Sequence, residues 1–388
     1  MEVVRPAPCQ PPQLWARARV FLPFRPFAPN SQITLAKPPN RSEMYNEPNC
    51  GFFDGSQEEY FKLFNCTGTA LKSVDPLIKF GGPATCALGW IPELFAFLQA
   101  SGAPADIVTT HLYPTDDRVA KSRDGFAAAI AEAAANVTRL GRPGMPLVIT
   151  EFNAGLGLPT EVNGDTAHSA AFVLHNALAL QGVANLEALS FWSVSDIFEE
   201  GGMDSQPFHN GFGIQSIYAV KKPVYRAMQM LAALPPAGVP VAFTGAAARA
   251  AHARAGSASA GAVDVVVGVD ASGAPVRAVT ALLTNYDYFG APPNATVVEL
   301  TFANLPAGCV LPAAATLELI DSTHANPNAE WVAQGGPMYP TQAQSDAQVA
   351  ASLLVEEALP LTRVGATSAR VSVPLEAFAV ARVRFSFE

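Results

Sequence analysis

The sequence of 388 residues contains no apolar run that approaches the roughly 20 residues of a membrane-spanning helix, and its first residues lack the apolar segment of a secretory signal. It also lacks an excess of positive charge, because 24 lysines and arginines face 33 aspartates and glutamates, for a net charge of −9. Proteins that bind a phosphate backbone normally present a Lys/Arg-rich face. We therefore expect neither a nucleic acid nor a membrane as a partner.

Cysteine is scarce, and its five positions include no C-x-x-C pair, which excludes a zinc ribbon and a thioredoxin-like motif. An odd number of cysteines leaves both the redox compartment and the disulfide pairing open. Four N-x-S/T triplets would permit N-glycosylation in a secretory compartment. These triplets begin at Asn40, Asn65, Asn136 and Asn294.

The composition that is present, 49% hydrophobic and 15% charged, is typical of a globular protein with room for two packed domains. Over residues 43–238, short apolar runs alternate five times with longer amphipathic stretches, as strand–helix units around a parallel sheet do. The clearest helix opens at Ser56 with Glu59 three residues later, which is a capping box. We predict an α/β fold in which these units form part of a (β/α)₈ barrel.

The segments on either side of these units differ from them in residue pattern and composition. Residues 239–388 show Val-rich alternation such as V-D-V-V-V-G-V-D, which predicts a β-sandwich domain without a catalytic constellation. Within it, the low-complexity run 245–262 is expected to be a flexible surface loop. Residues 1–42 are rich in Pro and Arg and lack periodicity, so we expect a disordered or irregular leader.

Two of the predicted strands end in a glutamate, Glu47 in Y-N-E-P-N and Glu151 in I-T-E-F-N. In a barrel such strand ends meet on one rim, where the active site lies. Paired carboxylates across a cleft carry out glycoside hydrolysis, one protonating the departing oxygen while the other attacks the anomeric carbon or activates water. A single glutamate would more simply cap a helix or meet solvent, but the pair favours catalysis.

Other side chains on the predicted rim are candidates for binding a sugar. Asn46 can donate to a hydroxyl, and Trp192 in F-W-S-V-S-D could lie under an apolar ring face. His111 and Tyr113 are two residues apart, so both should point to the same side of their strand, where either could keep Glu151 ionised and oriented. Each aromatic residue and the histidine could instead belong to the packed interior.

A glycine-rich loop follows Trp192, and loops of that length inside a domain are usually functional. Glu199 or Glu200 in this loop could accept hydrogen bonds from ring hydroxyls, or could form a solvated acidic patch. A metal site is a weaker alternative, because no H-E-x-x-H motif or helical His pair fixes a ligand geometry. Its candidate ligands would be His111, Asp116, Asp117 and His209.

These stretches together resemble glycoside hydrolase family 39, which holds β-xylosidases and α-L-iduronidases. The similar segments, in chain order, are YNEPN, VDPLIKFGGPAT, VTTHLYP, VITEFNAG, FWSVSDIFEEGG, FHNGFG and KKPVYRAMQML, and LIDSTHANPNAEWVAQGGPMYPT resembles the β-sandwich segment of the family. The resemblance implies a retaining mechanism that needs no cofactor, with Glu47 as general acid/base and Glu151 as nucleophile. It also implies sugar contacts from Asn46, His111, Tyr113, Trp192 and Glu200.

The charge pattern favours one branch of this family over the other. A uronic acid needs a cation for its carboxylate, typically a forked arginine contact. No arginine lies between Glu151 and Tyr225, where the only lysines are Lys221 and Lys222. We therefore expect an exo-acting, β-xylosidase-like enzyme for neutral sugars, with an α-L-iduronidase-like enzyme as the alternative.

The front of the sequence departs from the family, which would place three more strand–helix units before Glu47, whereas 46 residues precede it. We therefore expect five of the eight barrel units, with two open sheet edges, and a chain that is unstable or inactive when expressed alone. One alternative function is then an inactive carbohydrate-binding remnant, and another is a metal-dependent hydrolase. The family and the glycosylation triplets suggest a secretory, extracellular or lysosome-like compartment, while the oligomeric state stays open.

Overall fold

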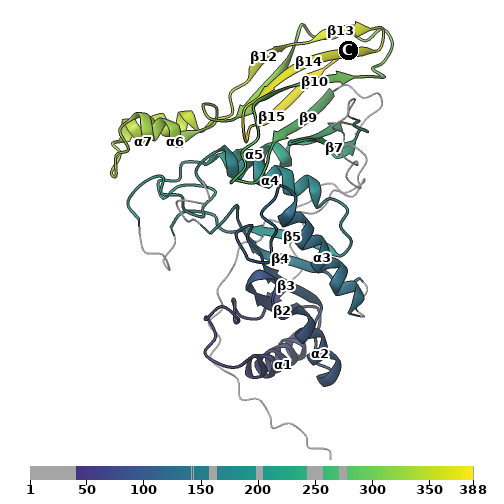
Figure 1. Ribbon diagram of the computed structural model, residues 1–388, viewed down its shortest axis with the longest axis vertical. Coiled ribbons are helices and arrows are strands. Elements are labelled where there is room, and N and C mark those ends of the chain that lie inside the picture. Colours follow the sequence, from purple (N-terminus) through teal and green to yellow (C-terminus); the bar gives the residue numbers. More distant parts are fainter. Residues whose placement is uncertain are drawn as a thin grey trace, which may run out of the picture.

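The computed structural model describes residues 41–140, 142, 144–156, 164–197, 204–242, 257–270 and 278–387. In Figure 1, helices surround a parallel sheet in one half of the molecule, and antiparallel sheets make up the other half. Most of the predicted leader lies outside the described residues, and the first observed strand begins at Arg41. No helix in these segments is long and apolar enough to cross a membrane.

The first half contains five parallel strands in sequence order, as the alternating pattern predicted. They are β1 (Arg41–Glu43), β2 (Lys79–Thr85), β3 (Ile107–His111), β4 (Leu147–Phe152) and β5 (Leu186–Phe191). The three central strands are buried on both faces, which explains why they read as continuous apolar runs. The partial-barrel prediction is therefore confirmed.

A helix follows each strand and packs on the outside of the sheet. The helices are α1 (Gln57–Val74), α2 (Ile91–Ser101), α3 (Gly125–Arg139), α4 (Ala167–Ala179) and α5 (Pro223–Ala232). The predicted capping box opens α1: the Ser56 hydroxyl accepts from the Glu59 amide, and the Glu59 carboxylate accepts from the Ser56 amide at 2.8 Å. Such a cap contributes about 1 kcal/mol to helix stability.

The five-stranded sheet is curled, so that its two edge strands approach each other. Arg41 of β1 and Glu187 of β5 form an ion pair although three strands lie between them in the sheet. Both side chains are partly buried. The sheet is thus a curled half-barrel in which this ion pair links the two edge strands.

The second half contains two antiparallel sheets, in agreement with the predicted β-sandwich. One sheet has three strands, β10 (Thr296–Phe302), β14 (Ser368–Leu375) and β13 (Thr362–Gly365). The other has the order β12 (Glu357–Pro360), β11 (Ala314–Ile320), β15 (Val380–Ser386), β9 (Ala278–Asn285), β8 (Val263–Val269) and β6 (Ala237–Gly238). Their facing apolar side chains form a separate core.

Two features of this half differ from the expectations. Strand β7 (Ser257–Ala260) lies within the run 245–262 and pairs with β8. The prediction of a surface loop is therefore wrong for the residues of β7. Residues 245–256 lie outside the described segments. Helices α6 (Pro327–Ala333) and α7 (Gln342–Ala351) interrupt the strands. Both helices have caps that the sequence contains, Asn326 before a proline and a T-x-x-Q capping box at Thr341.

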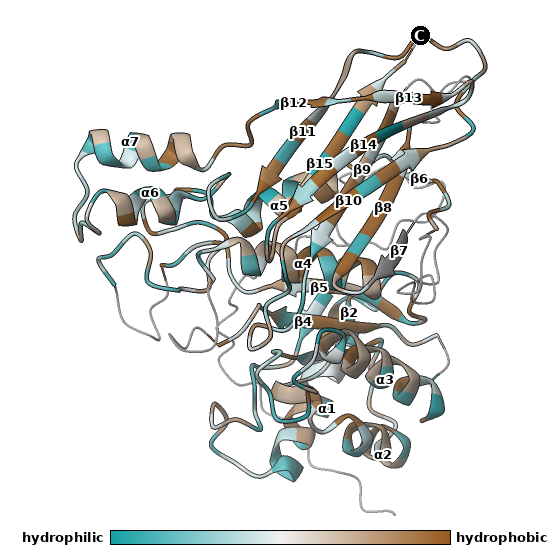
Figure 2. Ribbon diagram, turned by 45° about the horizontal axis from the view of Figure 1, so that its top comes forward, coloured by the Kyte–Doolittle hydropathy of each residue, from teal (hydrophilic) through white to brown (hydrophobic). Residues whose placement is uncertain are grey.

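Helix α4 lies between the two halves and is buried on nearly all sides, which explains its apolar sequence. Figure 2 shows the hydrophobic strands β8 and β9 beside it. Because side chains alternate along a strand, Val265 of β8 faces the sandwich core, whereas Asp264 and Val266 face α4.

Asp264 is the buried charge that joins the two halves. Its carboxylate accepts from Arg123 Nη2 at 2.5 Å and from His175 Nδ1, on α4, at 2.8 Å. Arg123 Nε also donates to the Tyr286 carbonyl at 3.1 Å. A carboxylate of the sandwich therefore neutralises the buried guanidinium of Arg123 and also binds the imidazole of His175.

We predict that Asp264→Ala lowers the free energy of unfolding by about 3–5 kcal/mol, because it removes the fully buried one of the two carboxylates that pair with the buried Arg123 guanidinium and leaves only the half-exposed Asp124. Urea denaturation at neutral pH measures this change. Glu299→Ala is the control, since it removes a carboxylate from an exposed pair with Arg370 and should cost about 0–1 kcal/mol. Equal losses in the two variants would contradict the role given to Asp264.

Candidate active site

The loop that follows β1 carries Glu47 and is fastened to the loop that follows β2. The Glu47 amide donates to the Ala84 carbonyl at 2.8 Å. Asn49 exchanges two hydrogen bonds with the backbone of Cys86, at 3.0 and 3.1 Å, and a disulfide joins Cys50 to Cys86. These contacts hold Glu47 in a left-handed backbone conformation, with φ at 44°, that a non-glycine residue adopts only at a cost of about 1–3 kcal/mol.

Glu151 stands on the rigid strand β4, and the parallel register sets it beside His111 at the end of β3. Its side chain is 10% exposed. The Tyr113 hydroxyl donates to Glu151 Oε1 at 2.8 Å. The two residues that the sequence placed on one side of their strand therefore both reach the β4 carboxylate.

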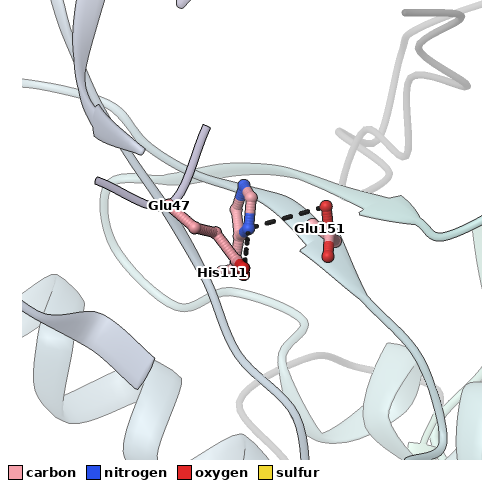
Figure 3. A group of neighbouring side chains, drawn as sticks. All are labelled: Glu47, His111 and Glu151. Atoms are coloured by element: carbon pink, nitrogen blue, oxygen red, sulfur yellow. Dashed lines mark hydrogen bonds and ion pairs between the residues drawn. The ribbon is translucent and has the colours of Figure 1, made fainter. Parts of the chain in front are cut away.

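The imidazole of His111 lies between the two candidate acids, as Figure 3 shows. Its Nδ1 is 2.8 Å from Glu47 Oε1 and 3.5 Å from Glu151 Oε2. This nitrogen and one oxygen of each carboxylate lie within 4.8 Å of one another. The fold thus brings together two glutamates that are far apart in the sequence.

The protonation of this cluster follows from burial and from the neighbouring charges. Burial disfavours a charged His111, but the contacts with Glu43 and Glu47 and the charge of Glu151 outweigh it and raise the pKa of His111 to about 9. Burial and the Glu151 charge raise the pKa of Tyr113 well above its ordinary value. At neutral pH the cluster therefore contains an imidazolium and a neutral phenol.

The spacing of Glu47, His111 and Glu151 is one that metal ligands can have, but a metal would first have to displace the proton between His111 and Glu47. A metal needs the lone pair of a neutral imidazole, whereas this imidazolium donates from Nδ1 to Glu47. The alternative ligand set with Asp116, Asp117 and His209 is not assembled among the described residues. The Asp116 carboxylate instead accepts from the Tyr113 amide at 2.8 Å.

Asn153 connects β4 to the remaining part of the rim, and it was not singled out from the sequence. Its side-chain amide donates to the carbonyl of Trp192 and, at 2.9 Å, to that of Phe212. The Trp192 amide donates to the Phe152 carbonyl at 2.8 Å, which places Trp192, directly after β5, beside the end of the strand that carries Glu151. The sequence feature that could have identified Asn153 is its position as a polar residue at the end of the I-T-E-F-N stretch.

The other residues predicted for the site have fewer contacts to report. Asn46 is half-buried directly before Glu47. His209 contacts the Gln206 carbonyl through Nδ1 at 3.0 Å, within the long loop. The predictions for Glu199 and Glu200 fall outside the described residues.

A second buried charge cluster holds the described part of the long loop against the rim. Lys222 Nζ lies 2.6 Å from Asp165 Oδ1 and 2.7 Å from Asp196 Oδ2, and it donates to the Gly211 carbonyl at 3.1 Å. The Gly213 amide donates to Asp196 at 2.7 Å. Burial opposes the charge of Lys222, but the two carboxylates outweigh it and raise its pKa.

Comparison with known proteins finds a matching family profile and individual relatives. Residues 40–367 match the sequence profile of Glycosyl hydrolases family 39. A β-xylosidase of Caldicellulosiruptor saccharolyticus is 30% identical over 327 residues, which cover 81% of this chain and 61% of that protein. A β-xylosidase of Geobacillus stearothermophilus is 33% identical over 208 residues, which cover 50% of this chain and 41% of that protein. The chain thus spans about three fifths of the first relative's length.

Solved structures show the same fold. A family 39 enzyme from Xanthomonas axonopodis pv. citri has a TM-score of 0.70 at 23% identity, over 89% of this chain and 67% of that one. A family 39 β-xylosidase from Caulobacter crescentus has a TM-score of 0.64 at 23% identity, over 88% and 66% of the two chains.

We predict that Lys222→Met lowers the free energy of unfolding by about 3–5 kcal/mol, because two buried carboxylates then lose their cation. Hydrogen exchange at the Asn210 and Gly213 amides, which donate to these carboxylates, should accelerate. Lys221→Met is the matched control, since the Lys221 ammonium contacts the Gln215 side chain and lies over the Tyr225 ring. Unchanged exchange in Lys222→Met would contradict the anchoring role.

Proposed function

Since the chain belongs to glycosyl hydrolase family 39, we propose that it is a retaining glycosidase with Glu47 as general acid/base and Glu151 as nucleophile. The observation that carries this proposal is the approach of one oxygen of each carboxylate to within 4.8 Å across His111. Retaining enzymes hold their carboxyl groups about 5–5.5 Å apart, whereas inverting enzymes need about 6.5–9.5 Å to admit a water molecule. The short separation therefore supports direct attack by a carboxylate.

In the first step, Glu151 attacks the anomeric carbon while Glu47 gives a proton to the departing oxygen, which leaves as an alcohol. A glycosyl ester then links the sugar to Glu151. In the second step, Glu47 takes a proton from water, which attacks the same carbon and releases both the sugar and the Glu151 carboxylate. Atoms and protons balance over the cycle without a cofactor.

The neighbours of the two acids suit these roles. The Tyr113 hydroxyl donates to Oε1 of Glu151, which stabilises the ionised carboxylate, while Oε2 lies 3.5 Å from His111 Nδ1. His111 stands 2.8 Å from Glu47, so the proton that Glu47 delivers has a short path from the imidazolium. Asn46 and Trp192 complete the proposed sugar contacts, together with Glu200.

We further propose that the substrate is a neutral sugar, in the manner of an exo-acting β-xylosidase. Lys222 is fully buried between Asp165 and Asp196, and Lys221 contacts Gln215. The two lysines considered as partners for a uronic acid therefore contact protein groups instead. An α-L-iduronidase-like activity is less well supported for this reason, and both relatives compared above are β-xylosidases.

The sequence led us to expect an inactive chain, but because Glu47 and Glu151 already approach each other within 4.8 Å we predict that the chain is active. In that case 2,4-dinitrophenyl 2-deoxy-2-fluoro-β-xyloside labels the chain on Glu151, as peptide mass spectrometry would detect. Glu151→Gln should abolish both labelling and turnover. Glu47→Gln should lower kcat/KM by about 10²–10⁴-fold for a xyloside with a poor leaving group, and far less for a dinitrophenyl xyloside, which departs without protonation. Glu93→Gln, an exposed carboxylate on α2, is the control. Labelling of another residue would overturn the assignment.

We also predict that kcat/KM for an aryl β-xyloside exceeds that for an aryl α-L-iduronide by about 10–100-fold or more, because an uncompensated carboxylate forfeits charge-assisted hydrogen bonds worth about 1.5–3 kcal/mol. Both substrates are compared on the same enzyme preparation at one pH. A preference for the iduronide would reverse the substrate assignment but leave the two-glutamate chemistry in place.

A further inference from the structure

Glu43 is a third carboxylate beside His111, and the chemistry above does not use it. It is the last residue of β1, four positions before Glu47, and its side chain is 11% exposed. Glu43 Oε1 lies 3.8 Å from His111 Nε2, on the side of the ring opposite to Glu47 and Glu151. The ring itself is fully buried.

The position of Glu43 is rigid. It pairs with Gly81 in the parallel register of β1 and β2, and the next amide, of Met44, donates to the Gly81 carbonyl at 2.9 Å. The buried Tyr60 hydroxyl lies 3.0 Å from the Met44 carbonyl. Glu43 thus approaches the ring from a strand, whereas Glu47 approaches it from a loop.

We propose that Glu43 is a positioning residue that keeps a proton on Nε2 of His111, so that the proton which the ring can lose is the one on Nδ1, facing Glu47. This inference rests on the proposed function and deepens it. A neutral imidazole has two tautomers, and the group that faces each nitrogen decides between them. A carboxylate at Nε2 stabilises the tautomer with hydrogen on that nitrogen.

The consequence for the reaction is directional. Loss of a proton from Nδ1 places it beside Glu47 Oε1, 2.8 Å away, where it is needed for the departing oxygen. Loss from Nε2 would send it toward Glu43, away from the two acids. The charge of Glu43 also offsets the cost of burying the His111 ring in its cationic form.

Three carboxylates face this ring within ion-pair distance in the described part of the chain: Glu43 from β1, Glu47 from the loop after β1, and Glu151 from β4. Beyond them, the Tyr113 hydroxyl binds Glu151, and Asp116 interacts electrostatically with Glu47. Contacts with Glu43 and Glu47 are among the causes that raise the pKa of His111 to about 9 against the effect of burial.

The test is Glu43→Gln, which keeps the shape of the side chain and removes its charge. The folded pKa of His111 is raised, so its cation is present below about pH 9 and is lost as the pH rises. Without the Glu43 charge, this pKa should fall by about 1 unit. In the pH profile of kcat/KM for 4-nitrophenyl β-xyloside, the alkaline limb should therefore move to lower pH by the same amount.

Nitrogen-15 NMR of histidine-labelled protein reads the ring directly, and His111→Gln assigns its signal among the six histidines. In the parent protein at high pH the neutral ring should carry its hydrogen on Nε2, and in Glu43→Gln the two tautomers should mix. An unchanged tautomer and pKa in Glu43→Gln would overturn the proposal, whatever the activity. Failure of the fluoro-xyloside to label Glu151 would instead overturn the proposed function and leave this reading intact.

Glu187→Gln is the matched control, because it removes a partly buried carboxylate on β5 that pairs with Arg41 and does not contact His111. The alkaline limb should stay in place in this variant.

If Glu43→Gln does not fold, Glu43→Asp is the substitute variant. It retains the charge at a greater distance and should shift the His111 pKa in the same direction by a smaller amount. An unchanged pKa would count against the proposal. In a His111→Gln background, Glu43→Gln should produce no further shift of the limb, and an added shift would show that Glu43 acts by another route.

Discussion

The contact of one buried imidazolium with carboxylates from different elements is the interaction on which the rest of this site depends. His111 stands opposite Glu151 because β3 and β4 pair in parallel, and Glu47 reaches the same nitrogen from the loop after β1. Two carboxylates this close would repel each other in a site with little water. The cation between them reduces that repulsion, so both acids can occupy the geometry that the proposed chemistry requires.

Ion pairs that are buried or partly buried join distant parts of this chain. Arg41 and Glu187 join the two edges of the curled sheet, Asp264 joins the sandwich to the helices of the barrel half, and Lys222 joins the long loop to the rim. Each buried charge carries a desolvation penalty that only the correct partner offsets. We interpret these pairs as a means of fixing the relative positions of elements, which apolar contacts alone would specify less sharply.

The sequence was sufficient to predict the five strand–helix units, the capping box at Ser56, the β-rich second half and the family, because each depends on local periodicity or on short motifs. It was not sufficient for β7, whose small residues pair with β8 only when that strand is present. The helix caps at Asn326 and Thr341 were visible but lay within a segment assigned to the sandwich by resemblance.

The sequence by itself determined which residue types stand at or just after the strand ends: two glutamates, a histidine, a tyrosine and a tryptophan, from which we propose the catalytic and sugar-binding roles. Only the tertiary structure decided what each of them contacts. Lys222 appeared in the sequence as a possible partner for a substrate carboxylate, and the fold gives it two aspartates instead. The physical reason is that periodicity records the face on which a side chain lies, whereas the charge, tautomer and reach of a buried group depend on neighbours that strand pairing brings from elsewhere in the chain.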